Sequence, residues 1–474
     1  MDQIGINLRL HEPIGSCYVA SWAKSQGFEV EVFSPHVSEI SMETILRGNP
    51  DMVCFSTLTY NYFVAEEAAR LLKQANSNII TVIGGYHATC IPQEISRKKS
   101  AGNTLLFDFV VPQEADYAVS DLAKHLNGRR PQDKIRGIIW RDGKVWANNF
   151  QRVDPNTNPI PFRTPEMMSG CRRYGLYYPA PSQQRAVALM VGSRGCPFNC
   201  KFCLSKEMFP TYSGQSTFYR DPENIIRETE LLQKQFGTNA VFFVDLDFYG
   251  LSKERIRTLS RMLAKTGMNW FAMSRVTAGC SDGKSFDPEI FELMKFGGCT
   301  QMGFGVESLV HKYKSGVQLE IPAWQELVRK LTDYLHKLGI LSKGYFILGD
   351  YGDTLESLAA EEAAILNSGF DDIRLSWMMY SPGSPWYNFV KGKNGFVTDD
   401  LSLFSTDYPI IRIPGVLPGQ LQEIRRVIQR RYYCRPEYAE QATGMVRRNP
   451  RLAQSFKEWN DILIRSLGQG FLPA

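Results

Sequence analysis

The sequence predicts an α/β protein built from two sheet-containing domains in series, followed by a helical region. Short runs rich in Val, Ile and Phe alternate with amphipathic stretches over residues 1–150, and the same alternation returns over 187–390. Strands separated by helices usually form parallel sheets, because antiparallel neighbours need only short turns. Residues 151–186, between the two series, are rich in Pro, Asn, Arg and Tyr, a composition typical of a linker.

The first series predicts a Rossmann-like, doubly wound sheet. Its apolar runs recur roughly every 25 residues, which leaves room for a helix between consecutive parallel strands. An amphipathic helix is expected over Val64–Ala75. The expected strands are Ile4–Leu8, Val30–Phe33, Met52–Ser56, Ile79–Gly85, Phe109–Val111 and Gly137–Trp140.

The second series contains strand and helix patterns in alternation, which predict a partial (β/α)6 barrel. In such barrels the functional groups gather at the C-terminal ends of the strands. Residues 391–474 carry a basic, helical pattern, and we expect a mostly helical cap there. The expected strands are Val187–Gly192, Ala240–Asp245, Trp270–Ser274, Gln301–Val306, Gly344–Gly349 and Ile373–Ser381; the expected helices are Pro222–Phe236, Lys253–Lys265, Pro288–Phe296, Pro322–Leu338 and Leu355–Asn367.

Composition excludes several classes of protein. Hydrophobic residues make up 43% and charged residues 22%, the balance of a globular protein. No apolar run reaches the roughly 18 residues of a spanning helix, and the first residues lack the pattern of a signal peptide. We therefore expect a cytoplasmic protein whose ten cysteines are mostly thiols or ligands. The net charge of +5 does not indicate a nucleic-acid-binding surface.

Three cysteines, Cys196, Cys200 and Cys203, follow the first barrel strand with the spacing C-x3-C-x2-C. A structural zinc ion needs four protein ligands, whereas a 4Fe–4S cluster held by three cysteines keeps one iron open for a substrate. Gly195 would let the backbone approach closely, and Phe202 would place an aromatic ring beside the cluster. A zinc site completed by a distant residue, or three unrelated thiols, are the alternatives.

The stretch SRGCPFNCKFC resembles the signature of the radical S-adenosylmethionine (SAM) enzymes. The resemblance extends along nearly the whole chain. The matching segments are specific when taken together, whereas each one alone is a weak signal. Further matching segments are VFFVDLDFYG (241–250), MKFGGCTQMGFGVES (294–308), GYFILGDYGDT (344–354), YSPGSPWYN (380–388) and YYCRPEYA (432–439), the last similar to a motif of the subgroup that carries a cobalamin domain.

The first domain resembles the cobalamin-binding domain of that subgroup, on the segments PDMVCFSTLTYNYFVAEEAARLLKQ, TVIGGYHAT and VVPQEAD. A Rossmann-like domain with only a structural role is the alternative, since no G-x-G-x-x-G fingerprint is present. Polar groups and glycines at the carboxyl ends of parallel strands suit a ligand there. The residues that the resemblance assigns to cobalamin are Ser56, Thr57, Thr59, Gly84, Gly85, His87 and Glu114.

One departure concerns the cobalt ligand. Cobalamin proteins that bind cobalt through histidine carry D-x-H-x-x-G, and this motif is absent; His11, in LHEPIG, has the wrong spacing to Gly15. The resemblance therefore implies cobalamin bound without a protein imidazole below the cobalt, an arrangement that would favour methyl transfer.

In the barrel, the resemblance assigns six residues to SAM. Asp245 and Asp247, two apart at a strand end, would hold its amine or ribose, although strand-end capping is the alternative. Arg275 would clamp its carboxylate, and Glu307 would contact SAM or else form a salt bridge. Gly303 and Gly305 alternate on one strand face and would leave room for a bulky ligand.

The resemblance implies a cobalamin-dependent radical SAM methyltransferase that acts on an unactivated carbon of a small-molecule intermediate. A 5′-deoxyadenosyl radical would remove hydrogen from the substrate, which would then take a methyl group from methylcobalamin. The implied cofactors are a 4Fe–4S cluster, SAM and cobalamin, with a flavodoxin or ferredoxin as electron donor. A cyclase or ring-rearranging enzyme of the same subgroup is the alternative, and a cofactor-sensing regulator is a more remote one.

Overall fold

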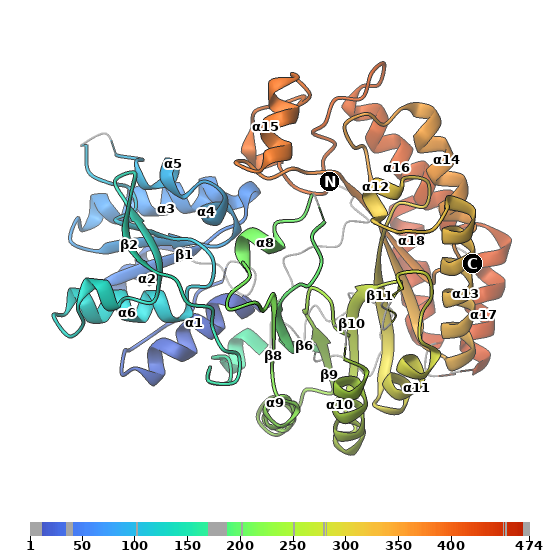
Figure 1. The fold of residues 1–474 in the computed structure, drawn as a ribbon, viewed down its shortest axis with the longest axis horizontal. Helices are drawn as coiled ribbons and strands as arrows, with labels where there is room; N and C mark the ends of the chain where they lie inside the picture. The colour runs from blue at the N-terminus through green and yellow to red at the C-terminus, as the bar shows by residue number, and fades with distance from the viewer. Residues whose placement is uncertain are drawn as a thin grey trace.

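The structure is a computed structural model that describes residues 12–34, 41–100, 103–168, 187–200, 202–249, 252–277, 280, 282–448, 450 and 453–467. The N-terminal domain and a larger α/β domain lie side by side, with the helical C-terminal region on the far side of the larger domain (Figure 1). The predicted strand Ile4–Leu8 and His11 fall outside the described residues, as does the second half of the predicted linker.

The N-terminal domain contains a five-stranded sheet in the order β1-β2-β3-β4-β5. Its first three strands are parallel, and apolar side chains pack on both faces, with Ile83 and Val110 on one and Val82 and Ile139 on the other. The strands are β1 (Met52–Ser56), β2 (Ile80–Gly84), β3 (Phe109–Val111), β4 (Gly137–Arg141) and β5 (Lys144–Asn149); the helices are α1 (Ile14–Ser25), α2 (Met42–Arg47), α3 (Tyr62–Ala75), α4 (Tyr86–Cys90), α5 (Pro92–Ser96) and α6 (Asp116–Leu126), with the 3-10 turns η2 (Thr59–Asn61) and η3 (Gln132–Lys134).

Two predictions for this domain are wrong. Val30–Phe33 forms no strand with any segment that the structure describes, although its alternating apolar residues suit one. The predicted strand at Gly137–Trp140 exists, but β4 runs antiparallel to β3 and pairs with β5 in a hairpin, so the sheet is not wholly parallel. The hairpin turns at Asp142 and Gly143, both with positive φ, as a tight hairpin turn requires.

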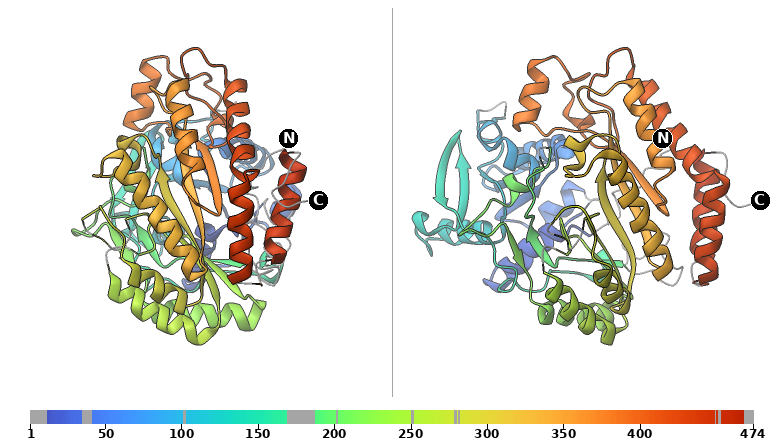
Figure 2. Two further views of the ribbon diagram at one scale, coloured as in Figure 1. Left: turned by 90° about the vertical axis from the view of Figure 1, so that its right-hand side faces the viewer. Right: turned by 45° about the vertical axis from the view of Figure 1, so that its right-hand side comes forward.

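The larger domain is a curved sheet of six parallel strands in the order β13-β12-β11-β10-β9-β6. The sheet curves into an open half-barrel with β6 and β13 at its edges, and helices cover its outer face (Figures 1 and 2). All six predicted strands are present. They are β6 (Val187–Met190), β9 (Ala240–Phe243), β10 (Asn269–Arg275), β11 (Cys299–Glu307), β12 (Leu341–Leu348) and β13 (Asp372–Trp377); the helices are α9 (Pro222–Phe236), α10 (Lys253–Thr266), α11 (Pro288–Phe296), α12 (Lys312–Ser315), α13 (Ile321–Leu338) and α14 (Leu355–Leu366).

Local sequence explains where these helices begin and end. Ser252 and Thr354 cap α10 and α14 by accepting backbone N–H groups of the first turn. Gly237, Gly267 and Gly339 end α9, α10 and α13 in the left-handed conformation that glycine adopts without strain. The short pair β7 (Ser193–Gly195) and β8 (Thr217–Tyr219) and the helix α8 (Ser205–Met208) lie between β6 and α9.

The C-terminal region is mostly helical, as predicted. Tyr433 and Tyr438 are buried against the barrel, where their hydroxyls donate to Asp372 and to the Asp371 carbonyl. The helices are α15 (Pro385–Gly392), α16 (Pro418–Tyr433), α17 (Pro436–Arg448) and α18 (Ala453–Leu467), with the 3-10 turn η4 (Leu401–Leu403). Within the described residues, none of the helices is long and apolar enough to cross a lipid bilayer.

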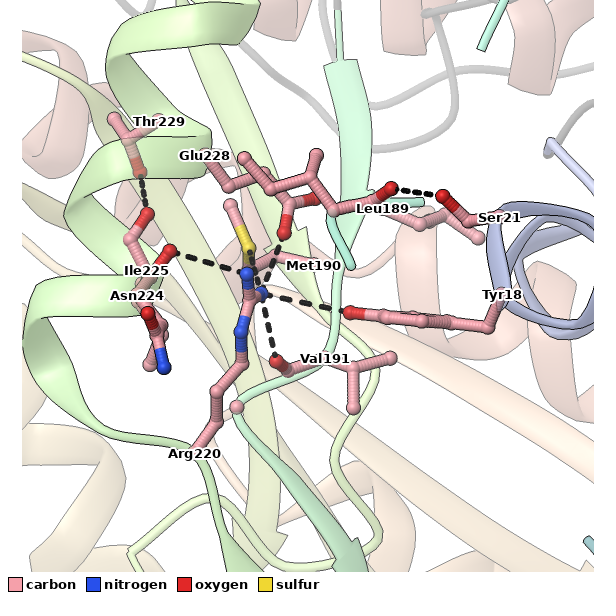
Figure 3. A network of polar contacts seen from close by, with 12 residues as sticks. Tyr18, Ser21, Leu189, Met190, Val191, Arg220, Asn224, Ile225, Glu228 and Thr229 are labelled. Carbon is pink, nitrogen blue, oxygen red and sulfur yellow. Dashed lines mark hydrogen bonds and ion pairs between the residues drawn. The ribbon is translucent and has the colours of Figure 1, made fainter. Parts of the chain in front are cut away.

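Two buried arginines join the N-terminal segment to the barrel edge. Arg163 donates to Glu12 at 2.6 Å and to Glu228 at 2.8 Å. Arg220 donates to Glu228 at 2.5 Å and lies 3.5 Å from the hydroxyl of Tyr18 on α1 (Figure 3). Each buried carboxylate faces a guanidinium, which offsets the desolvation of both charges. The network therefore fixes α1 beside β6.

Candidate active site

The three predicted cluster cysteines lie together in the loop between β7 and α8, on the C-terminal side of β6. The backbone N–H of Cys203 donates to the Cys200 carbonyl at 3.0 Å. Burial, together with the charges of Asp247, Cys203 and Cys200, raises the pKa of the Cys196 thiol to about 11. The thiols are thus close enough to interact electrostatically.

The number of thiols favours a cluster over a single zinc ion. A structural zinc site takes four protein ligands, one more than the cysteine loop offers. A cuboidal cluster is ligated at separate iron atoms, so its cysteines need not converge on one point. Three thiols in one loop therefore fit a 4Fe–4S cluster better than zinc.

Asp245 holds the start of this cysteine loop. Its carboxylate accepts the backbone N–H of Gly192 at 2.9 Å and the Ser193 hydroxyl at 2.5 Å. Burial raises its pKa to about 6. Gly195 (φ +103°) follows, where an added Cβ would lie 2.1 Å from the Ser216 carbonyl oxygen. Both carboxylate oxygens of Asp245 are thus engaged by the chain, so the structure gives it a loop-positioning contact.

A second group of predicted residues surrounds Cys200. Asp247 accepts the Ser274 hydroxyl and the backbone N–H of Arg275. The Arg275 guanidinium lies 4.2 Å from the ring centroid of Phe198 in the cysteine loop. Burial raises the pKa of both Cys200 and Glu307, and the charge of Arg275 opposes this rise. Arg275 therefore links the ends of β10 and β11 to the cluster position.

Glu307 ends β11 in a strained conformation. Its φ is +62°, which is unfavourable for any residue with a side chain. Burial raises its pKa to about 7, and the charge of Arg275 opposes this rise. Strained backbone and a buried acid are both features that gather at functional sites.

The two predicted glycines of β11 are covered by the chain's own side chains. A Cβ on Gly303 would lie 2.8 Å from the Tyr345 ring, and one on Gly305 would lie 2.8 Å from the Glu307 carboxylate. Phe202, expected beside the iron–sulfur cluster, packs against the apolar side chains around α15, which include Tyr380 and Tyr387. A ligand seated over Gly303 would have to displace Tyr345.

In the N-terminal domain, the predicted residues meet at the carboxyl ends of β1 and β2. Gly85 has φ +89°, and an added Cβ would lie 2.6 Å from both the N and the O atom of Thr57. The Thr57 N–H donates to the Gly84 carbonyl at 3.1 Å, and Ser56 beside them is exposed. Glycine at 85 therefore allows two strand-end loops to touch through their backbones.

Two buried polar atoms, one after β2 and one after β3, have no hydrogen-bond partner among the described residues. They are Nε2 of His87 and the side-chain oxygen of Gln113. The other ring nitrogen of His87 lies 3.2 Å from the Thr59 hydroxyl, and burial lowers the pKa of His87 to about 4. Unsatisfied buried polar atoms call for a ligand or water. Cobalamin, which carries several amide side chains, fits this requirement.

The two groups of residues face each other across the domain interface. The Thr89 hydroxyl of α4 lies 4.0 Å from Sδ of Met208 in α8, directly after the cysteine loop. An added Cβ on Gly383, between β13 and α15, would lie 2.5 Å from the Cys90 carbonyl oxygen of α4. Burial raises the pKa of the Tyr86 phenol at the start of α4 to about 12, and the nearby charge of Cys203 contributes to the rise.

Sequence reasoning missed three residues at this interface: Asp116, Arg152 and Arg194. Glu114, predicted to bind cobalamin, accepts hydrogen bonds from Arg152 at 2.5 Å and from Arg194 at 3.2 Å. Arg194 also donates to both oxygens of Asp116, at 2.8 and 2.9 Å. These partners are between 38 and 80 residues apart in sequence, so no local motif could have indicated the contacts.

Family models match both domains. The B12 binding domain model matches residues 8–123, and the radical SAM superfamily model matches residues 190–361. The chain belongs to the radical SAM enzymes that carry a B12-binding domain. The two matches together span more than half of the chain, and they place the strand-end residues of β1 and β2 in one domain and the three cysteines in the other.

Curated relatives are similar over most of the chain. An uncharacterized methyltransferase of Pyrococcus horikoshii, PH0819, is 25% identical over 90% of this chain and 88% of its own. The cytidylyl-2-hydroxyethylphosphonate methyltransferase of Streptomyces wedmorensis is 24% identical over 90% of this chain and 87% of its own. The anaerobic magnesium-protoporphyrin IX monomethyl ester cyclase of Rubrivivax gelatinosus is 26% identical over 78% of this chain and 64% of its own.

Solved structures share the fold. The cobalamin-dependent SAM radical enzyme OxsB, solved with aqua-cobalamin and SAM bound, superposes with a TM-score of 0.68, 16% identity, and coverage of 97% of this chain and 70% of its own. The radical SAM methyltransferase TsrM of Kitasatospora setae, solved with cobalamin and a [4Fe-4S] cluster, gives a TM-score of 0.59, 16% identity, and coverage of 83% and 74%. The predicted three-part architecture is confirmed.

Proposed function

We propose that this chain is a cobalamin-dependent radical SAM methyltransferase that methylates an unactivated carbon of a small-molecule intermediate. The observation that carries the proposal is the contact between α4, which follows the Gly84–Gly85 pair, and α8, which follows the three cysteines. A methyl group can pass to a substrate radical only if both cofactors reach the same small space. The methyltransferases among the similar proteins support this reaction class.

When bound, the cluster with SAM supplies a 5′-deoxyadenosyl radical, and cobalamin supplies the methyl group. Cys196, Cys200 and Cys203 would hold the cluster and leave one iron open for SAM. Arg275 and Glu307 lie beside Cys200 with opposite charges, which suits the carboxylate and the amine of SAM. Asp245 keeps the cysteine loop in place through Gly192 and Ser193.

On the other side of the interface, Ser56, Thr57, Thr59, His87 and Gln113 would face cobalamin. All five side chains are uncharged near neutral pH, because burial keeps the pKa of His87 low. Neutral donors and acceptors suit the amide groups of the cofactor. The close packing of α4 against α8 and Gly383 would keep water out of the space between the cofactors.

The similarity to the Rubrivivax cyclase favours a second candidate, ring formation or rearrangement without methyl transfer. Product mass separates the two candidates. A gain of one CH2 supports methyl transfer, and any other change in mass supports the second candidate. The substrate in either case is expected to be a small molecule, with a flavodoxin or ferredoxin as electron donor.

The test begins with cluster-reconstituted protein, prepared without oxygen, incubated with hydroxocobalamin and then desalted. Near-stoichiometric cobalt with about four irons per chain, and 5′-deoxyadenosine formation on addition of SAM and a reductant, support the proposal. Iron and SAM cleavage without cobalt would leave a radical SAM enzyme and remove the methyl-transfer mechanism.

A further inference from the structure

One guanidinium holds the cysteine loop at both ends. Arg152 donates from Nη2 to the Arg194 carbonyl at 3.1 Å, two residues before Cys196. It donates from Nη1 to the Pro210 carbonyl at 3.0 Å, shortly after α8. Its side chain is fully buried. A planar guanidinium presents its donors in a fixed geometry, so these bonds set the distance between the ends of the loop.

The third donor of the same guanidinium reaches the other domain. Nε of Arg152 donates to Glu114 at 2.5 Å, and Arg194 donates to the second oxygen of Glu114 at 3.2 Å. Arg194 is tied to Asp116 as well. Two guanidinium groups thus face two carboxylates in a buried group of charges. Removing any one of the four would leave a buried charge unpaired and would destabilise the protein.

Glu114 in turn is connected to the strand ends assigned to cobalamin. It directly follows Gln113, whose backbone N–H donates to the Thr89 hydroxyl at 2.8 Å. The Thr89 hydroxyl donates to the Gly85 carbonyl at 2.9 Å. Three hydrogen bonds and the peptide bond between Gln113 and Glu114 therefore connect Gly85, through Thr89, to the Arg152 guanidinium.

We propose that Arg152 is a positioning residue that couples the two cofactor sites: a ligand seated against Gly85 and Gln113 stabilises the cysteine loop through Glu114 and Arg152. This inference rests on the function proposed above. Because coupling between two binding sites is reciprocal, a cluster in the loop must tighten cobalamin binding by the same factor. Arg194 and Asp116 strengthen the connection by fixing Glu114 from its other side.

The experiment measures the affinity of the full chain for hydroxocobalamin, by absorbance titration without oxygen, with and without the reconstituted cluster. In the wild-type protein we expect the cluster to tighten binding about fivefold or more, the lower end of typical coupling between sites. Arg152→Lys keeps the charge but cannot bond two carbonyls and a carboxylate in one plane. In this variant the ratio of the cobalamin affinities with and without the cluster should fall towards one.

Arg163→Lys is the matched control. Arg163 is an equally buried arginine that bonds two carboxylates and the Leu189 carbonyl, but it joins α1 to the barrel away from the cysteine loop. We expect this variant to lose stability without changing the ratio of affinities. Glu114→Gln is the second variant, for the case that Arg152→Lys does not fold, and it should also lower the ratio.

A second readout does not need the cluster. In the cluster-free wild-type protein, hydroxocobalamin should slow amide hydrogen exchange over residues 195–210, and in Arg152→Lys it should not. The inference is overturned, and the proposed function is not, if the cluster leaves the cobalamin affinity of the wild-type protein unchanged. The same holds if the Arg152 and Glu114 variants keep both the wild-type ratio of affinities and the wild-type hydrogen exchange. A wild-type protein that binds no cobalamin overturns the proposed function and the inference together.

Discussion

The two sets of strand ends that meet at the domain interface carry side chains of different charge. At the carboxyl ends of β1, β2 and β3 most groups are neutral, namely hydroxyls, one uncharged imidazole, a glutamine and a glycine pair, while the charged Glu114 is paired with two arginines. At the ends of β10 and β11 they are charged, with Asp247, Arg275 and Glu307 around the cysteine loop. Neutral groups suit a large ligand rich in amides, and charged groups suit a small zwitterion such as SAM.

Glycine also serves the two regions differently. Gly85 allows backbone to touch backbone, because any side chain would strike Thr57. Gly303 and Gly305 instead lie under side chains, the Tyr345 ring and the Glu307 carboxylate. A ligand at the neutral region would meet a backbone contact, whereas a ligand over Gly303 or Gly305 would have to displace a side chain. This contrast can be tested from each side.

Cys200→Ala should have the largest effect and acts only on the charged region. Removal of one of three thiolates should abolish cluster binding and SAM cleavage, since the loop offers no replacement ligand in the residues that the structure describes. Iron content and 5′-deoxyadenosine formation measure this. Cys434→Ala, at the end of α16, is the control. Full iron content with normal cleavage in Cys200→Ala would contradict the site assignment.

Gly85→Ala should act only on the neutral region. The new Cβ would meet the Thr57 backbone at 2.6 Å, so the strand ends must separate, and cobalamin affinity should fall more than about tenfold. Gly27→Ala is a close control, because Gly27 has φ +88° but no atom within 4 Å of the added Cβ. It should cost about 1–2 kcal/mol of stability and leave cobalamin affinity unchanged. Equal effects of the two variants would show that backbone strain, not contact with Thr57, matters.

Glu307→Gly should separate stability from binding in the charged region. Removing the side chain relieves the positive φ, so the free energy of unfolding should rise by about 1 kcal/mol. SAM affinity should fall about tenfold as one charged contact is lost. Calorimetric titration and thermal denaturation measure the two effects. Glu307→Gln keeps the backbone strain, so it should weaken SAM binding without the gain in stability. Unchanged SAM affinity in both variants would exclude a contact between Glu307 and SAM.

The last prediction is a pH dependence of the neutral region. Burial lowers the pKa of His87 to about 4, against about 6.5 in the unfolded chain. The unfolded chain therefore binds more protons between these values, so stability should fall as pH drops from about 6.5 to about 4. In His87→Gln that part of the loss should disappear from thermal denaturation curves. Parallel curves for the wild type and the variant would mean that His87 is not held neutral by the fold.

The barrel was the most predictable part of the molecule. The bounds predicted for α9 and α11 are confirmed residue for residue, and those of the other barrel helices to within one, because proline or a cap begins each helix and its apolar face repeats regularly. The N-terminal domain was less predictable. The Asp-Gly pair at 142–143 is a strong hairpin signal that would have revealed the antiparallel β4–β5 pair. Val30–Phe33 has the alternation of a strand but no partner strand in the described residues.

The candidate site was predictable only where residues are close in sequence. The three cysteines and the glycine pair are short motifs, and both lie at strand ends as expected. The contacts of Asp245 with Gly192 and Ser193, and those of Arg152 with Glu114, join segments 38 to 53 residues apart. Such contacts depend on how the chain folds back on itself, and no periodicity or spacing in the sequence encodes them.

Gly383 has a consequence for the distance between the two domains. Its missing side chain lets the loop after β13 rest directly on the Cys90 carbonyl of α4. Gly383 (φ +85°) therefore sets how closely the loop after β13 approaches α4, because any Cβ at this position would meet the Cys90 carbonyl oxygen and the Ile91 side chain. Gly383→Ala already makes both contacts, so even this smallest substitution should loosen the seal between the two domains.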